Sequence, residues 1–184
     1  MTLTKTPICN FGEKAKDFNL TSIQNKKVSL SEIKGDNGTL IMFICNHCPY
    51  VKAIIKDIAE DTKFLENIGV KSVAIMSNDV KNYPEDSFEN MKSFSKSHNF
   101  SFPYIIDDTQ KVAKEYGAVC TPDFFGYNKN LELQYRGRIR ELKDLKPVTR
   151  GDSDLSIAMK QIATSGMGPK KQIPSMGCNI KWLK

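Results

Sequence analysis

The sequence predicts a single α/β domain in which a central mixed sheet is flanked by helices. Two largely apolar runs, residues 39–45 and 70–76, are bounded by turn residues, as expected of strands buried on both faces of a sheet. The segment between them has the apolar period of a helix, and a strand, helix and strand of this size form a right-handed parallel crossover. No repeat or shift in composition marks a second domain within residues 1–184.

The elements around the first buried strand follow from local patterns. Alternating apolar and polar residues over 18–30, with a turn at 24–27, predict an N-terminal β-hairpin extension, and residues 31–35 predict a helical turn. The helix after the strand begins at Pro49 and ends near Gly69. Its buried face is expected to carry Val51, Ile54, Ile55 and Ile58.

The second half of the chain continues the alternation of helices and strands. A helix is expected from Pro84 to about His98, then a strand at 102–108 and a short helix that ends at Gly117. Residues 120–139 predict a strand, a turn and an antiparallel return strand.

The last predicted helix has Asp152 or Ser153 as its N-cap and ends at Gly166. The core of the domain therefore spans about residues 12–165, and residues 166–184 are expected to form an irregular C-terminal tail. This tail should pack on the core, because the side chains of Ile180 and Trp182 are costly to leave in water.

Composition excludes several classes of function. The net charge is +6, but the basic residues are interleaved with 21 acids and do not alternate with aromatics, so nucleic-acid binding is not expected. No apolar run is long enough to cross a membrane. The first residues are charged and lack the apolar segment of a signal peptide, which predicts a cytoplasmic protein.

The chemistry is expected at Cys45 and Cys48, in the stretch FICNHCPYV. Cys45 ends a buried strand and Cys48 lies in the first turn of the next helix, where unpaired N–H groups and the helix dipole stabilise a thiolate. Residues three apart on a helix are neighbours, so the two sulfurs can alternate between dithiol and disulfide. His47, when protonated, is expected to favour the thiolate of Cys45, unless it is an exposed histidine without effect.

Two other interpretations of the pair are less favoured. A structural zinc site needs two more ligands, and the remaining candidates, Cys9, His98, Cys120 and Cys178, are isolated in the sequence. Two inert buried cysteines are unexpected at the functional edge of a sheet. No organic cofactor is predicted, because thiol exchange needs none and the chain has no glycine-rich phosphate loop.

The order of these motifs resembles the thioredoxin superfamily, in particular the thioredoxin-like proteins of the alkyl hydroperoxide reductase and thiol-specific antioxidant (AhpC/TSA) group. The resemblance covers about residues 12–137, in the segments GEKAKDFNL, LIMFICNHCPYVKAI, VAIMSNDVKNYPEDSF and YGAVCTPDFFGYN. It implies a thioredoxin fold and a cis peptide bond between Thr121 and Pro122 that faces the cysteine pair. These two residues would then position a disulfide partner by strand-like pairing.

The sequence departs from the patterns of this superfamily at three places. Ile44 stands where thioredoxins have tryptophan, and the pair encloses Asn-His. Met42 and Gly38 stand where peroxiredoxins have threonine and proline, which argues against direct peroxide reduction by their mechanism. The acidic residue that aids proton transfer in thioredoxins has no counterpart in the preceding strand, so Asp79 and Glu85 are the substitute candidates.

The three other cysteines receive separate predictions. Cys178, in the tail segment PSMGCNIKWL, is a candidate for a resolving or shuttle role, with a purely structural tail as the alternative. Cys120 is expected to be a buried small hydrophobe, with redox involvement as the second option. Cys9 receives no role.

The predicted function is thiol–disulfide oxidoreduction. The Cys45 thiolate attacks a protein or small-molecule disulfide, Cys48 resolves the mixed disulfide, and an external redox partner restores the pair. The alternatives are a thiol-dependent peroxidase that uses Cys45 and a non-catalytic binding module with the same fold. The sequence leaves both a monomer and a dimer open, as well as the direction of electron flow.

Overall fold

The computed structural model describes residues 2–184. The helices are α1 (Pro49–Asn67), α2 (Phe88–Ser97), α3 (Lys111–Tyr116) and α4 (Asp154–Ser165), with a 3₁₀ turn at Pro84–Asp86. The strands are β1 (Leu3–Lys5), β2 (Asn19–Ser22), β3 (Lys27–Ser29), β4 (Gly38–Phe43), β5 (Val70–Met76), β6 (Tyr104–Ile106), β7 (Cys120–Thr121), β8 (Asp123–Tyr127), β9 (Leu133–Tyr135), β10 (Leu142–Lys143), β11 (Lys146–Pro147) and β12 (Met176–Asn179).

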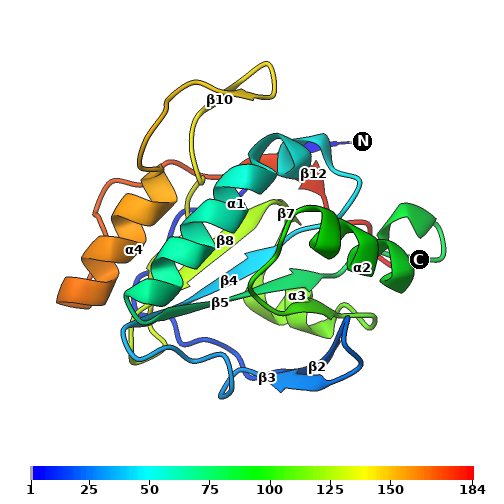
Figure 1. The fold of residues 1–184 in the computed structure, drawn as a ribbon, viewed down its shortest axis with the longest axis horizontal. Coiled ribbons are helices and arrows are strands. Elements are labelled where there is room, and N and C mark those ends of the chain that lie inside the picture. The colour runs from blue at the N-terminus through cyan, green and yellow to red at the C-terminus, as the bar shows by residue number, and fades with distance from the viewer. Residues whose placement is uncertain (1) are drawn as a thin grey trace.

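A seven-stranded mixed sheet forms the centre of the molecule, in the order β3-β2-β6-β5-β4-β8-β9 (Figure 1). Strands β4, β5 and β6 are parallel, and β2, β8 and β9 join the sheet by antiparallel pairing. The predicted crossover is present as β4-α1-β5, and the predicted N-terminal hairpin is β2-β3. Because parallel strands in such a sheet are covered on both faces, all six residues of β4 are buried.

Alternate residues of β4 belong to two separate hydrophobic clusters. Leu40 and Met42 pack with residues of α1, α2 and α4 on one face of the sheet, whereas Ile41 and Phe43 pack with α3 on the other. This division follows from the two-residue period of a strand. The apolar run therefore fixes the position of β4 at the centre of the molecule and of its carboxyl end beside α1.

The ends of α1 and α4 are those that the sequence predicts, whereas the helix predicted from Pro84 is a 3₁₀ turn at Pro84–Asp86 followed by α2 from Phe88. Cys48 is the N-cap of α1, with Pro49 as the first helical residue, and Gly69 follows the helix with a positive φ of 79°. Ser153 caps α4 in a capping box with Ser156, and Gly166 ends that helix in the left-handed conformation. Position 48 is thus fixed at the helix start by the local sequence.

The expectation of an irregular tail is wrong over Met176–Asn179. These residues form β12, which pairs with β1 on one side and β7 on the other in a three-stranded sheet. The tail does pack on the core: Ile180 is buried, while the ring of Trp182 is 39% exposed and lies against Lys114. Short β12 escaped prediction because its pairing partners lie far away in the sequence.

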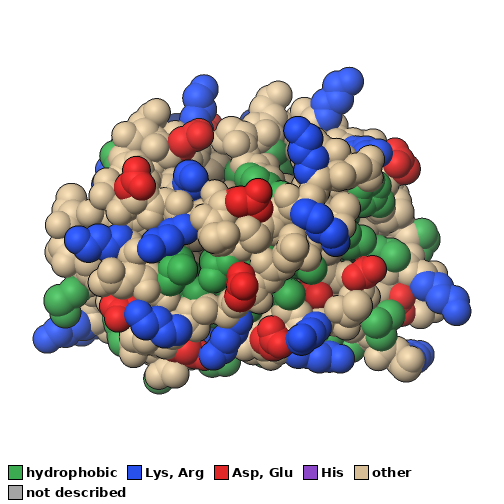
Figure 2. Space-filling model, turned by 90° about the horizontal axis from the view of Figure 1, so that it is seen from below, with side chains coloured by type: hydrophobic (Ala, Val, Ile, Leu, Met, Phe, Trp, Pro, Cys, Tyr) green, Lys and Arg blue, Asp and Glu red, His purple; other side chains and the backbone are tan. Residues whose placement is uncertain are grey.

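The surface mixes charges of both signs. On the face drawn in Figure 2, lysine and arginine side chains are interspersed with aspartate and glutamate side chains. This arrangement corresponds to the interleaving of basic and acidic residues along the chain. Within residues 2–184, the structure contains no helix with the length and apolar character needed to span a membrane.

Candidate active site

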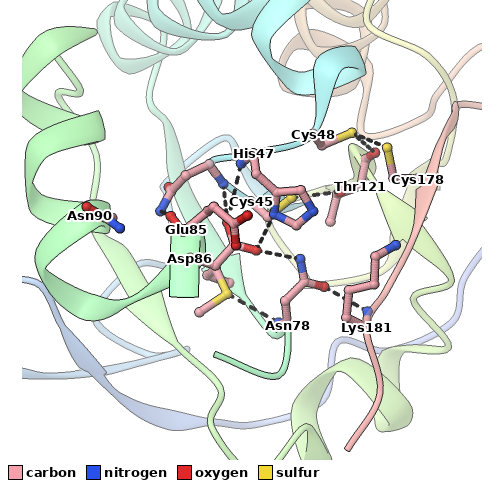
Figure 3. A network of polar contacts seen from close by, with 12 residues as sticks. Cys45, His47, Cys48, Asn78, Glu85, Asp86, Asn90, Thr121, Cys178 and Lys181 are labelled. Atoms are coloured by element: carbon pink, nitrogen blue, oxygen red, sulfur yellow. Dashed lines mark hydrogen bonds and ion pairs between the residues drawn. The ribbon is translucent and has the colours of Figure 1, made fainter. Parts of the chain in front are cut away.

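Cys45 and Cys48 lie between the end of β4 and the start of α1, at the carboxyl edge of the parallel strands (Figure 3). Cys45 is 1% exposed and Cys48 is fully buried. Both are thiols in this structure. The sequence placed them at this edge, and the structure adds that the surrounding chain closes over both sulfurs.

Thr121 contacts both sulfurs from β7. Its peptide bond to Pro122 is cis. The Cys45 Sγ lies 3.3 Å from the Thr121 hydroxyl oxygen, and the Cys48 Sγ lies 3.2 Å from the Thr121 carbonyl oxygen, to which a Cys48 thiol donates. Thr121 and Pro122 therefore form the wall that faces the cysteine pair.

A third sulfur belongs to the same cluster. Cys178, on β12, is 2% exposed, and its Sγ lies 2.8 Å from the Cys48 Sγ. The strand register places Cys178 directly opposite Thr121. The tail cysteine that the sequence singled out therefore lies against the CxxC motif.

The contact between the two motif thiols lowers the pKa of Cys48 and raises that of Cys45. The Cys45 thiol lowers the pKa of Cys48 to about 5, and the Cys178 thiol and the Val51 N–H act in the same direction against burial. The same contact with Cys48, together with burial and the nearby Asp86 carboxylate, raises the pKa of Cys45 well above its ordinary value. A thiolate at the start of a helix is also favoured by the helix dipole. The sequence expected this thiolate at Cys45.

His47 is paired with a carboxylate. Its Nδ1 lies 2.7 Å from Oδ2 of Asp86, whose side chain is fully buried, and its ring stacks on that of Tyr83. The hydrogen bond to Asp86 raises the pKa of His47 against the opposing effect of burial. When protonated, the imidazole forms an ion pair with Asp86, and the charge that the sequence assigned to tuning Cys45 is then largely compensated.

Asp86 is the functional residue that the sequence did not identify. Its Oδ1 accepts hydrogen bonds from the backbone N–H of Asn46, at 2.8 Å, and of His47, at 3.3 Å, and its Oδ2 accepts one from the Asn78 amide at 2.8 Å. The Tyr104 hydroxyl completes the network by donating to the Asn46 side chain at 2.9 Å. One buried carboxylate thus holds both residues between the cysteines.

The two proposed proton-transfer acids point elsewhere. Asp79 accepts hydrogen bonds from the Asn82 side chain and from the Lys81 backbone, and the Asn82 amide lowers its pKa. Glu85 is exposed and contributes its backbone carbonyl, which accepts a hydrogen bond from the Asn46 amide. The only sequence signal for Asp86 was its place beside Glu85. The sequence could not show which of these two carboxylates points inward, because the geometry of the 3₁₀ turn decides it.

The remaining cysteines are less closely connected to the motif. Cys120 is fully buried on β7, with its Sγ 3.6 Å from the Pro122 carbonyl oxygen, and burial raises the pKa of its thiol. Cys9 is half-buried, and its partial burial raises its pKa to about 11. Both therefore have the character of protonated structural thiols.

One group of side chains has the spacing of metal ligands. The Cys45 sulfur, the His47 Nδ1 and an Asp86 oxygen lie within 4.8 Å of one another. Zinc usually takes four ligands, and here the imidazole nitrogen is already hydrogen-bonded to the carboxylate. The arrangement fits an ion pair in the reduced site better than a preformed zinc site.

The mixed sheet, the cysteine pair at a strand end and the facing cis-proline define a protein of the thioredoxin-fold class. The thioredoxin domain of a thiol-disulfide oxidoreductase from Bacteroides vulgatus has the same fold, with a TM-score of 0.64 at 15% identity over 83% of this chain and 97% of that one. Residues 11–142 match the model of the AhpC/TSA family. The chain belongs to this family.

Two other proteins resemble the chain more closely. The crystal structure of an uncharacterized conserved protein from Geobacillus kaustophilus matches with a TM-score of 0.94 at 38% identity, covering 100% of this chain and 97% of that one. The thiol-disulfide oxidoreductase ResA of Bacillus thuringiensis is 26% identical over 127 residues, which are 69% of each chain. The match to the Geobacillus protein extends through the tail that carries Cys178.

Proposed function

We propose that the chain is a thiol–disulfide oxidoreductase that cycles Cys45 and Cys48 between dithiol and disulfide. The observation that carries this proposal is the contact of both sulfurs with Thr121, at 3.3 and 3.2 Å, across the wall formed by the cis-proline. The family and the resemblance to ResA support the same chemistry. The pair needs no cofactor for this reaction.

The exchange proceeds through a mixed disulfide. The proton of Cys45 passes to the Cys48 thiolate, and the Cys45 sulfur attacks one sulfur of a substrate disulfide, so that the other substrate sulfur leaves as a thiolate. The Cys48 sulfur, after losing its proton to that leaving group, attacks the Cys45 sulfur, the bond between Cys45 and the substrate breaks, and the second substrate sulfur leaves as a thiolate. Two electrons pass to the substrate, and the enzyme holds a Cys45–Cys48 disulfide that an external dithiol reduces.

The residues around the pair have distinct roles in this scheme. Thr121 and Pro122 form the wall against both sulfurs and would position the partner by side-chain contact, because β12 already pairs with Thr121 and leaves no room for the strand-like pairing that the resemblance implied. His47 acts through Asp86: their ion pair holds the loop between the cysteines and limits the field of the Asp86 carboxylate at Cys45. A hollow of about 470 Å³ adjoins Pro122, Tyr50 and Ser175, and we place the approach of the disulfide partner there.

The test of this proposal is the trapping of the mixed disulfide. We expect Cys48→Ser, which lacks the resolving sulfur, to accumulate a covalent adduct on Cys45 when it is treated with 5,5′-dithiobis(2-nitrobenzoate), as measured by intact mass. The control Cys9→Ser keeps the pair and should release the aromatic thiol and end as a disulfide. Failure of the native pair to cycle between dithiol and disulfide in redox buffers would overturn the proposal.

A thiol-dependent peroxidase is the second candidate. The closed site favours it, since sulfurs that are 1% and 0% exposed are more accessible to a small oxidant than to a folded protein, and the Thr121 hydroxyl can hydrogen-bond to a peroxide beside Cys45. This candidate predicts peroxide consumption that Cys45→Ser abolishes and Cys48→Ser retains. If both variants lose peroxide consumption, the reaction needs both thiols, and the dithiol mechanism proposed above explains it.

The third possibility is a non-catalytic module that binds a metal at Cys45, His47 and Asp86. Metal analysis of protein purified without added metal separates it from the enzyme, which should contain less than about 0.1 ion per chain.

We keep the cytoplasm as the proposed location, because thiols remain reduced there. A disulfide substrate and a redox partner are the proposed partners.

A further inference from the structure

The C-terminal tail is built into the redox site as a strand. In β12, Cys178 pairs with Thr121 and Asn179 with Cys120, so the tail covers the β7 edge immediately before Pro122. β12 also pairs with β1, and Ser175 donates a hydrogen bond to the Pro122 carbonyl at 2.8 Å. The strand edge beside the cysteine pair is therefore already occupied by the chain itself.

Gly177 shows how closely the tail approaches this wall. A Cβ at position 177 would lie 2.0 Å from the Thr121 carbonyl oxygen and 3.0 Å from the Pro122 ring. Only a residue without a side chain fits between the two backbones at this point. The approach brings the next residue, Cys178, to its position against Cys48.

Cys48 interacts with both of the other cysteines, Cys45 and Cys178. Its Sγ lies 2.8 Å from the Cys178 Sγ, less than 1 Å beyond a disulfide bond length of about 2.05 Å. We propose that Cys178 is a third redox thiol, which exchanges with the Cys45–Cys48 disulfide and stores the oxidising equivalent as a Cys48–Cys178 disulfide. This inference rests on the proposed cycling of Cys45 and Cys48.

The exchange balances without an external oxidant. The Cys178 sulfur attacks the Cys48 sulfur of the Cys45–Cys48 disulfide, the Cys48–Cys178 bond forms and the Cys45–Cys48 bond breaks. Cys45 leaves as a thiolate and takes up the proton that Cys178 gives up. Cys178 is oxidised from thiol to disulfide, and Cys45 is reduced back to a thiol that is ready for another substrate.

The surroundings of Cys178 fit this change of state. In the reduced site, burial and the hydrogen bond to Cys48 raise the pKa of Cys178 to about 12, so its thiol stays protonated. Formation of the Cys45–Cys48 disulfide removes the Cys48 thiolate and with it that contribution. The Lys181 cation, which lowers the pKa of Cys178, then acts without this opposition. Oxidation of the motif thus lowers the pKa of Cys178 from its value in the reduced site, while burial still raises it.

The test is a map of the disulfides in the oxidised protein. The full chain is oxidised with diamide, quenched in acid, unfolded with a thiol-alkylating reagent and digested for mass spectrometry. We expect a Cys48–Cys178 linked peptide, with alkylation of Cys178 reduced at least about tenfold while Cys45 is alkylated. Cys45→Ser should form the same bond, and Cys178→Ser should instead protect Cys45.

The control Cys9→Ser should give the native map. The inference is overturned if the oxidised native protein holds Cys45–Cys48 with Cys178 fully alkylated, or if Cys45→Ser, checked for native unfolding behaviour, forms no Cys48–Cys178 bond. In those cases the cycling of Cys45 and Cys48 stands. Absence of any disulfide among the three cysteines in the native protein would overturn the proposed function as well.

Discussion

The two cysteines of the motif are separated by two residues, yet their surroundings come from different parts of the chain. Cys45 borders a polar network in which Asp86 holds Asn46 and His47. Cys48 faces the sulfur of Cys178 and the backbone of Thr121. The contact with Cys48, burial and the Asp86 carboxylate raise the pKa of Cys45, whereas the Cys45 and Cys178 thiols lower that of Cys48. The contact between the two motif cysteines therefore separates their pKa values, and Asp86 and Cys178, from segments outside the motif, act in the same directions.

Removal of the carboxylate on the Cys45 side should have the largest effect. Asp86→Ala leaves the N–H of Asn46 and the amide of Asn78 without their acceptor in a buried site, so we expect a loss of about 3 kcal/mol in the free energy of unfolding. Urea unfolding measures it. The control Glu85→Ala, at an exposed side chain, should change stability by less than about 0.5 kcal/mol. One hydrogen bond contributes about 1 kcal/mol to stability. A smaller loss than this in Asp86→Ala would contradict the structural role of the carboxylate.

Displacement of the tail on the Cys48 side should have the next largest effect. Gly177→Ala introduces a Cβ that meets the Thr121 carbonyl oxygen, so β12 must shift, at a cost of about 2 kcal/mol by urea unfolding. Met176→Ala, at a partly exposed position of the same strand, is the matched control and should cost less than about 1 kcal/mol. Equal stability of the two variants would show that the tail does not need this close approach.

The thiolate at Cys48 can be titrated by its absorbance near 240 nm. We expect an inflection near pH 5 in the reduced protein, and Cys45→Ala should move it upward by at least about one unit, or 1.4 kcal/mol, because the first hydrogen-bond donor is lost. Cys178→Ala should move it less, since its thiol contributes less than that of Cys45. An unchanged inflection in Cys45→Ala would show that a contact other than that with Cys45 lowers the pKa of Cys48.

The smallest effect concerns the His47–Asp86 ion pair. The pKa of His47 is raised in the folded state, so its contribution to stability is present below its ordinary pKa and is lost as the pH rises through the folded value. His47→Asn should therefore cost more at pH 6 than at pH 9. Solvent screening keeps the difference below about 1 kcal/mol. Urea unfolding at the two pH values measures it, and a larger cost at pH 9 would reverse the sign of the argument.

Local patterns in the sequence predicted the frame of the site. The apolar run of β4 and the start of α1 at Pro49 place Cys45 and Cys48 at the strand edge, because strand burial and helix capping depend on neighbouring residues. The tail cysteine was recognised, but not its partner, because the pairing of Cys178 with Thr121 joins distant parts of the chain.

The partner of His47 was also beyond prediction. Glu85 and Asp86 are adjacent carboxylates, and the geometry of a single 3₁₀ turn decides that Asp86 is buried while Glu85 is exposed. The charge on Cys48 follows from hydrogen bonds between three sulfurs that only the folded chain brings together. Sequence spacing therefore located the chemistry and placed the two thiols in contact, and the long-range contacts with Asp86 and Cys178 add to the difference between their pKa values.

The position of β12 between β1 and β7 has a consequence for the order in which the molecule forms during synthesis. β12 leaves the ribosome after every other helix and strand of this structure, although it joins β1, the earliest of them, to the redox site. Domains emerge from the ribosome amino end first, so the main sheet can form while Cys48 still lacks the Cys178 sulfur. A nascent chain stalled before β12 would thus carry a two-cysteine site, and release of the tail would complete the third position.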